Sequence, residues 1–167
     1  MVTSSSYTVQ PITPADEPFL WEMLYQALYA PEGSAPFPRD VVRHPAISRY
    51  VQGWGRPDDS GFLAVEGNRE QPVGATWIRL LTGDNKGYGY VDDATPELSI
   101  AVMPEHRGRG VGTSLLLHLL SAVKGRYPAI SLSVSADNPA LRLYQRLGFA
   151  VVKTSGTSLT MRKALGI

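Results

Sequence analysis

The sequence predicts an α/β fold, in which a central, twisted, mixed sheet of about six to seven strands is flanked by about four helices. Segments with apolar residues at every second position, typical of half-buried strands, alternate with segments whose apolar residues recur at helical spacing. Near the middle of the chain, a strand pattern leads through a glycine-rich turn directly into a helix pattern. With 43% hydrophobic residues in 167, we expect residues 1–167 to form a single domain with a buried core, and residues 1–6 to be a disordered tail.

Residues 7–12 are predicted to form a first strand, which Pro11 confines to an edge because proline has no N–H to donate. Pro14 and Asp16 then open a helix that extends to Leu28 and carries Leu20 and Met23 on its apolar face. Within this helix Trp21, Tyr25 and Tyr29 lie at i, i+4 and i+8. Such a stripe either packs in the core or lines a substrate pocket.

Residues 41–54 are predicted to form a second, shorter helix, interrupted near Pro45. Residues 61–66 and 72–82 have the pattern of two neighbouring strands, joined by the turn Gly67-Asn68. Residues 82–95 form a loose, glycine-rich connection that leads into the next strand.

Residues 97–124 combine a strand, a turn and a helix. The strand covers 97–102 and ends before Pro104, which cannot donate to a ladder. The helix that follows has one wide apolar face, and Gly125 provides its C-terminal stop. Its apolar positions are Val111, Leu115, Leu116, Leu119, Leu120 and Val123.

The turn before this helix has the features of an anion site. Gly108, Gly110 and Gly112 let backbone N–H groups face outward at the positive end of the helix dipole. Arg107 and Arg109 add two planar guanidinium groups that suit phosphate. The expected ligand is a polyphosphate, and the alternative is a plain surface turn with solvated arginines. The spacing matches neither a P-loop nor a dinucleotide fingerprint.

The last third of the chain repeats the alternation of strand and helix. Ile130, Leu132 and Val134 alternate with serines, as in a half-buried strand. Asn138 is a good N-cap for a helix that Gly148 ends. Two closing strands are predicted at about 149–153 and 158–162.

Two motifs in this chain resemble those of the GNAT superfamily of N-acetyltransferases. The sequence Arg107-x-x-Gly110-x-Gly112 is similar to that family's acetyl-coenzyme A motif, and residues 138–149 look like its second signature. The resemblance implies a GNAT-like fold and acetyl-coenzyme A as co-substrate. The coenzyme-binding residues that it implies are Ile100, Val102, Arg107, Gly108, Arg109, Gly110, Gly112, Thr113, Asn138 and Tyr144.

Acetyl transfer to an amine needs a base, because an alkylamine with a pKa near ~10.4 is almost fully protonated at pH 7. The resemblance makes Glu97 the first candidate, and Asp92 or Asp93 could serve instead. It also makes Tyr144 the partner of the departing thiolate, either as general acid or as a hydrogen-bond donor to the developing charge. The alternative for Tyr144 is an aromatic residue packed in the core. Backbone N–H groups near Val102 would bind the thioester oxygen if the strand is splayed there.

The leading hypothesis is an N-acetyltransferase in which an amine attacks acetyl-coenzyme A directly in a ternary complex. The alternative is a non-catalytic sensor of acyl-coenzyme A. The carboxylates of Asp92, Asp93 and Glu97 favour a cationic acceptor, on which Trp21, Tyr25 and Tyr88 could stack. A small molecule or a peptide amine fits equally well at this stage, and the resemblance implies a homodimer as a further expectation.

Composition excludes several other classes of function. A net charge of +1 gives no global attraction to nucleic acid or to an anionic membrane. The absence of cysteine excludes disulfides, cysteine metal sites and acyl-cysteine intermediates. His44 has no other ligand at metal-binding spacing, so we expect no metal. Residues 1–7 do not resemble a signal peptide, and no apolar run reaches the ~20 residues of a membrane span, so a cytoplasmic protein is expected.

Overall fold

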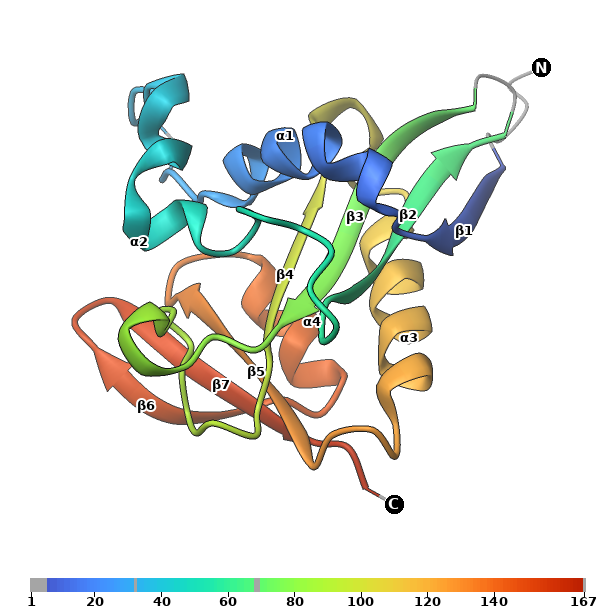
Figure 1. Ribbon diagram of the computed structural model, residues 1–167. Coiled ribbons are helices and arrows are strands. Elements are labelled where there is room, and N and C mark those ends of the chain that lie inside the picture. Colours follow the sequence, from blue (N-terminus) through green and yellow to red (C-terminus); the bar gives the residue numbers. More distant parts are fainter. Residues whose placement is uncertain (1–5, 32, 68–69, 167) are drawn as a thin grey trace.

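The computed structural model describes residues 6–31, 33–67 and 70–166. It contains a seven-stranded sheet with the strand order β1-β2-β3-β4-β5-β7-β6 (Figure 1). The strands are β1 (Tyr7–Pro11), β2 (Ser60–Glu66), β3 (Gln71–Arg79), β4 (Glu97–Val102), β5 (Ala129–Ser135), β6 (Ala150–Ser155) and β7 (Ser158–Ala164). The predicted α/β class with a mixed sheet is therefore confirmed. Residues 1–5 of the expected tail lie outside the described residues. Asn68 of the expected turn Gly67-Asn68 also lies outside them.

The sheet is antiparallel except where β4 meets β5. These two parallel strands pair only at Glu97 and Ser131, where both begin to run side by side. Beyond that pair they diverge, so the middle of the sheet opens toward its C-terminal end (Figure 1). This opening lies directly before the glycine-rich turn.

The described part of the chain contains four α-helices, two of which cover opposite faces of the sheet. The four helices are α1 (Glu17–Ala27), α2 (Pro45–Ser48), α3 (Val111–Val123) and α4 (Ala140–Arg146). Helix α1 packs on β3 and β4, whereas α3 packs on β1, β2, β3 and β4 from the opposite face (Figure 1). Short 3₁₀ turns, η1 (Pro14–Asp16), η2 (Arg39–Arg43), η3 (Gly83–Asn85) and η4 (Pro104–His106), complete the connections.

Two main clusters of buried side chains hold these layers together. On one face, Leu20 and Met23 of α1 pack against Trp77 of β3, and all three are fully buried. On the other face, Leu116 and Leu119 of α3 pack with apolar residues of β3, β4 and β5. The apolar face predicted for the helix after the turn is thus its core-facing side. Burial of each such side chain is worth about 1.5–3 kcal/mol.

The predicted interruption near Pro45 is confirmed, but the helix predicted over 41–54 is much shorter in the structure. The structure has the 3₁₀ turn η2, then the four residues of α2, and then turns up to Gly53. Pro45 separates the two short helices, because it lacks an N–H and because it holds the preceding His44 in an extended conformation (ψ 133°). The Nδ1 of His44 accepts the Ala46 N–H at 3.1 Å, which gives this histidine a capping role.

The first helix is also shorter than predicted. It is preceded by the 3₁₀ turn η1 and ends at Ala27, so Tyr29 lies beyond it. Val123, on the predicted apolar face of α3, is buried as expected. Among the described residues, none of the helices has both the length and the apolar character needed to cross a membrane. No group of three or more potential metal ligands occurs in this part of the chain.

Candidate active site

The diverging strands leave one edge of β4 free of strand partners. Met103 donates its N–H to the Val73 carbonyl at 2.7 Å. Because an antiparallel ladder alternates, Ala101 is the preceding residue whose N–H and C=O face β3. The N–H and C=O groups of Ile100 and Val102 therefore face the opening between β4 and β5. Splaying of the strand at this point was the condition stated above for binding the thioester oxygen. An edge of this kind can also pair with an amide-bearing chain.

The glycine-rich turn lies at the end of this edge. Gly108 and Gly110 adopt left-handed conformations with φ of 77° and 81°, which other residues rarely adopt. Gly110 is the N-cap of α3, so the first N–H groups of the helix have no side-chain cap among the described residues. A Cβ on Gly112 would lie 3.8 and 3.9 Å from the side chains of Ile100 and Val102, which are ordinary contact distances, so the helix start lies beside β4 with room for a methyl group.

A large cavity of about 770 Å³ connects these elements. Its volume is in the range of about 300–1,000 Å³ that is typical of ligand sites. The residues that the resemblance assigns to the coenzyme line it, with the exception of Arg109. Those residues are Ile100, Val102, Arg107, Gly108, Gly110, Gly112, Thr113, Asn138 and Tyr144.

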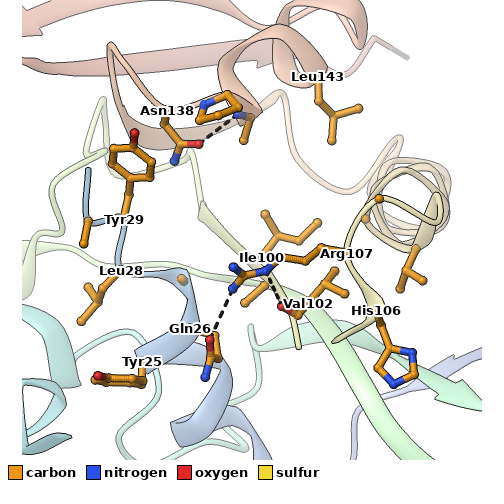
Figure 2. A pocket seen from close by; sticks show the side chains of 18 of the residues that line it. Tyr25, Gln26, Leu28, Tyr29, Ile100, Val102, His106, Arg107, Asn138 and Leu143 are labelled. Atoms are coloured by element: carbon orange, nitrogen blue, oxygen red, sulfur yellow. Dashed lines mark hydrogen bonds between the residues drawn. The ribbon is translucent and has the colours of Figure 1, made fainter. Parts of the chain in front are cut away.

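Arg107 spans the cavity between β4 and α1. Its Nε donates to the Val102 carbonyl at 3.0 Å, and its Nη2 donates to Oε1 of Gln26 at 3.3 Å (Figure 2). The guanidinium thus binds the free edge of β4 and not the backbone of the turn. Gln26 could not be predicted from the sequence, because a glutamine on a helix carries no motif of its own.

Arg109 points out of the cavity toward the first strand. Its Nη1 donates to the Tyr7 hydroxyl at 3.4 Å, and this hydroxyl lies 2.9 Å from Nδ1 of His106. The rings of Tyr7 and His106 also meet edge to face, with their centroids 5.8 Å apart. His106 lines the cavity, so these contacts fix one rim of the turn to β1.

Helix α4 supplies the opposite wall. Oδ1 of Asn138 accepts the Ala140 N–H at 2.9 Å, which is a capping contact, although the N-cap position itself belongs to Pro139. Tyr144 is only 8% exposed, and its ring contacts Phe149 edge to face with centroids 6.0 Å apart. Burial raises the pKa of the Tyr144 hydroxyl to about 12.

A second cavity of about 280 Å³ adjoins the first. Seven of the described residues line both cavities and so lie at the boundary between them, namely Ala27, Leu28, Tyr29, Phe37, Ile100, Asn138 and Tyr144. Glu97 and Tyr50 line the second cavity only. The arrangement places a phenol where the two cavities meet and a carboxylate inside the smaller one.

The Glu97 carboxylate is buried and hydrogen-bonded on both oxygens. Oε1 accepts from the Tyr50 hydroxyl at 3.1 Å and from the Gly89 N–H at 2.8 Å, and Oε2 accepts from the Gly87 N–H at 2.9 Å. Burial raises the pKa of the Glu97 carboxyl, although these hydrogen bonds and the charge of Arg49 act in the opposite direction. Glu97 thereby ties the 87–89 segment to the start of β4.

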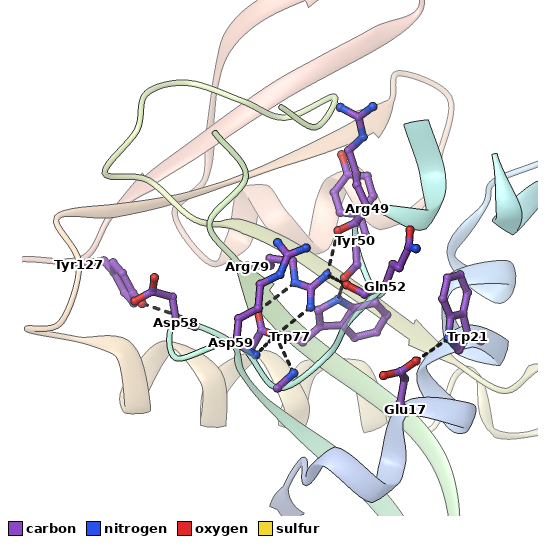
Figure 3. Close-up of polar contacts among 12 residues, drawn as sticks. Glu17, Trp21, Arg49, Tyr50, Gln52, Asp58, Asp59, Trp77, Arg79 and Tyr127 are labelled. Carbon is purple, nitrogen blue, oxygen red and sulfur yellow. Dashed lines mark hydrogen bonds and ion pairs between the residues drawn. The ribbon is translucent and has the colours of Figure 1, made fainter. Parts of the chain in front are cut away.

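Tyr50 is held in place by a buried polar network (Figure 3). Nε1 of Trp77 donates to the Tyr50 carbonyl at 2.9 Å, and Nη1 of Arg79 donates to the Arg49 and Gln52 carbonyls at 3.0 and 2.6 Å. Arg79 also forms a two-pronged ion pair with Asp59, with distances of 2.9 and 2.8 Å. The backbone around Tyr50 is therefore fixed by β3, without helical structure of its own.

The Asp59 carboxyl in this network keeps its charge. Burial alone would raise its pKa, but the hydrogen bonds from Arg79 and from the Gly55 and Arg56 N–H groups outweigh burial and lower it. A buried pair that is satisfied in this way costs about 3–5 kcal/mol to break at one partner. No sequence motif pointed to this network.

The residues expected to bind the acceptor are distributed over three places. Tyr88 lines the smaller cavity, and Tyr25 lines the larger one, where its hydroxyl donates to the Phe37 carbonyl at 2.6 Å. Trp21 lines neither cavity, because its Nε1 donates to Glu17 at 3.2 Å and its ring packs on the core. Asp92 and Asp93 also line neither.

The two aspartates have partners within their own loop. Oδ1 of Asp92 accepts from the Ala94 N–H at 2.9 Å and the Thr95 hydroxyl at 2.7 Å. Oδ1 of Asp93 accepts from the Tyr90 hydroxyl at 2.6 Å. Their role in this structure is to shape the loop before β4.

The sequence model of the acetyltransferase (GNAT) family matches residues 20–149. A mycothiol acetyltransferase of Streptomyces bingchenggensis is 31% identical over 157 residues, which are 92% of this chain and 46% of that protein. The chain thus spans about half the length of that relative.

Two solved structures share the fold. The ribosomal-protein-S18-alanine N-acetyltransferase of Escherichia coli has a TM-score of 0.66 at 18% identity, covering 97% of this chain and 96% of its own. The PaiA N-acetyltransferase of Thermoplasma acidophilum, solved in complex with coenzyme A, has a TM-score of 0.66 at 17% identity, covering 95% and 99%. Since the family model covers most of its length, the chain belongs to the GNAT acetyltransferase family.

Proposed function

We propose that this chain transfers an acetyl group from acetyl-coenzyme A to a primary amine, by direct attack in a ternary complex. One observation carries the proposal: the cavity that contains the glycine-rich turn meets a second cavity that contains a buried carboxylate, and Tyr144 lies at their boundary. Two adjoining cavities suit two substrates that must be bound at once.

The larger cavity fits acetyl-coenzyme A. The N–H groups of residues 108–112 and the N-terminus of α3 provide donors for its phosphates. The N–H and C=O groups of Ile100 and the N–H of Val102, which face the opening between β4 and β5, would provide partners for the amides of its pantetheine arm, whereas the Val102 carbonyl already accepts from Arg107. When bound, acetyl-coenzyme A supplies the acetyl group as an activated thioester.

Glu97 is the proposed base. Burial raises the pKa of its carboxyl toward neutral pH. A general base is most effective when its pKa lies near the pH at which the enzyme works. Three of the roughly four lone-pair positions of a carboxylate are used here, so Oε2 can still accept from an amine or from an intervening water. Asp92 and Asp93, the other candidates, line neither cavity.

Tyr144 is the proposed partner of the departing thiolate. The pKa of the phenol is about 12, so full transfer of its proton to a thiolate of pKa ~8.5 would be uphill by about 5 kcal/mol. We therefore assign it a hydrogen bond to the developing negative charge and not early proton transfer. Donors on the free edge of β4 would bind the thioester oxygen.

The test combines binding with turnover. Acetyl-coenzyme A at a hundred times its Kd should stabilise the fold by ~2.7 kcal/mol, which raises the Tm by roughly 5–11 °C. ATP and NAD at the same concentration should have a much smaller effect. Mass spectrometry of a mixed amine panel should then detect an acetylated product together with released coenzyme A. Binding of the coenzyme without any acetylated amine would support the sensor alternative instead.

A further inference from the structure

The smaller cavity has an unusual balance of charge. Of the described residues that line it, Glu97 is the single charged one, and none is arginine, lysine or histidine. The positive charge of Arg49 acts on Glu97, but its Nε donates to the Pro45 carbonyl at 2.9 Å and its Nη1 donates to the Lys86 carbonyl. Arg49 is thus hydrogen-bonded to two backbone carbonyls and does not line the cavity.

A single carboxylate in the wall limits which charged groups a ligand can carry into this cavity. A carboxylate on the ligand would lie beside Glu97 with no cation to pair with, and burying an unpaired charge is costly. A single ammonium can use the one free acceptor position on Glu97. A second ammonium would find no further carboxylate among the described lining residues.

Apart from the Asn138 carboxamide, the rest of the cavity wall is apolar or carries hydroxyl groups, and two of its aromatic side chains are open to solvent. Phe37 is 41% exposed and Tyr88 is 62% exposed, and both belong to the few large hydrophobic residues exposed among those described. They come from separate loops, one after α1 and one before β4. Exposed aromatic residues that converge on a cavity indicate an apolar ligand that covers them.

We infer that the acceptor is a compact primary amine with one positive charge and an apolar, aromatic-sized body, and without a carboxylate. This inference rests on the proposed transfer function and specifies its second substrate. The volume of about 280 Å³ is just below the range of about 300–1,000 Å³ for drug-sized ligands, so a small body fits better than a long or branched one. Amino acids, polyamines and aminoglycosides are disfavoured.

The test uses acceptors that differ in one group at a time. Phenethylamine, phenylalanine and phenylalaninamide share an aromatic body, and among them phenylalanine alone carries a carboxylate. We expect kcat/KM for phenethylamine to exceed that for phenylalanine at least tenfold, and phenylalaninamide to recover most of the loss. Spermidine, with several charges and no aromatic body, should be at least tenfold worse than phenethylamine.

A variant that adds a cation to the cavity tests the same argument from the protein side. Ser158 lines the cavity and is exposed at the start of β7. Ser158→Arg should raise kcat/KM for phenylalanine about tenfold and should not raise it for phenethylamine. Thr154→Arg is the matched control, because Thr154 is exposed on β6 and lines neither cavity. It should leave the ratio of the two substrates unchanged.

The outcomes separate the inference from the proposed function. If phenylalanine, spermidine or a peptide with a free N-terminus is acetylated as well as or better than phenethylamine, the inference is overturned and the transfer function stands. If acetyl-coenzyme A raises the Tm and the mixed panel contains an acceptor but none of these amines is acetylated, the inference alone is overturned. If no amine of the panel is acetylated either, both are overturned. An unchanged preference in Ser158→Arg, with an unchanged Tm, would also contradict the charge argument.

Discussion

The hydroxyl of Tyr50 donates to Oε1 of Glu97 at 3.1 Å and accepts the Tyr88 N–H at 2.7 Å. It thereby joins the loop after α2, the loop before β4 and β4 itself at one point inside the smaller cavity. Glu97 adds bonds from Gly87 and Gly89 to the same point. The candidate base is therefore also the residue that fixes the shape of the acceptor cavity, and changes here should affect stability and activity together.

Glu97→Gln should change the pH dependence of stability. Burial raises the pKa of the Glu97 carboxyl in the folded state above its ordinary value. Its contribution is therefore complete below the unfolded pKa and is lost as pH rises through the folded pKa. Urea denaturation between pH 4 and 8 should show the wild type losing stability relative to Glu97→Gln as pH rises. A wild type that instead gains stability relative to Glu97→Gln as pH rises would mean that the folded pKa is lowered.

Gly87→Ala should disturb the same point sterically. A Cβ at this position would overlap both carboxylate oxygens of Glu97 and the Tyr50 hydroxyl, none of which can move without losing a hydrogen bond. We expect a loss of about 1–3 kcal/mol, the usual cost of overpacking, measured by denaturant titration. Gly67→Ala is the control, because its Cβ would meet the nearest atom at an ordinary 3.4 Å. Equal stability of the two variants would show that the loop adjusts easily.

The parts of the fold that the sequence predicted best carry local signals. The spacing of apolar residues and the flanking Gly110 and Gly125 define α3 without reference to any other segment. The contact of Tyr50 with Glu97 joins residues 47 positions apart, and that of Tyr7 with His106 joins residues 99 apart. Such contacts leave no periodic pattern in the sequence, so neither could be predicted from it.

The aromatic stripe shows how a local pattern can mislead. The i, i+4, i+8 spacing of Trp21, Tyr25 and Tyr29 predicts one surface only if the helix continues through all three. Because α1 ends at Ala27, Tyr29 leaves the stripe and its hydroxyl donates to the Asp137 carbonyl at 3.2 Å. Trp21 contacts Glu17 and the core. The spacing therefore identified three aromatic residues but could not predict that each has a different role.

Arg107→Ala should weaken binding of acetyl-coenzyme A by about 1.5–3 kcal/mol, if the guanidinium leaves Val102 and Gln26 to contact a phosphate. The loss should shrink at high salt, because Arg107 is exposed. Gln26→Ala is the matched variant. It removes one partner of Arg107 in the cavity but no positive charge, so we expect less than a threefold change in Kd. Isothermal titration measures both.

Equal affinity of Arg107→Ala and wild type for the coenzyme would mean that the guanidinium serves only to bind the free edge of β4. In that case the backbone N–H groups of the turn would account for phosphate binding by themselves.

Tyr144→Phe tests the assignment of the phenol at the boundary of the two cavities. The substitution removes one hydroxyl and keeps the ring, so the contact with Phe149 should survive and the Tm should change little. If the hydroxyl meets the sulfur mainly as negative charge develops, its loss falls on the transition state and not on ground-state binding. We expect kcat to fall by roughly ten- to a thousandfold, while KM for acetyl-coenzyme A moves little.

The control for this variant is Tyr127→Phe, because the Tyr127 hydroxyl donates to the Asp58 carbonyl at 3.5 Å and lines neither cavity. It should retain full kcat on the acceptor found in the amine panel. Full kcat in Tyr144→Phe as well would make Tyr144 a core aromatic residue, as the packing on Phe149 alone would suggest. A drop in kcat together with an equal rise in Kd for the coenzyme would place the hydroxyl in ground-state binding. Only a drop in kcat at unchanged Kd supports a hydrogen bond that forms with the departing thiolate, because an interaction made in both states cannot accelerate the chemical step.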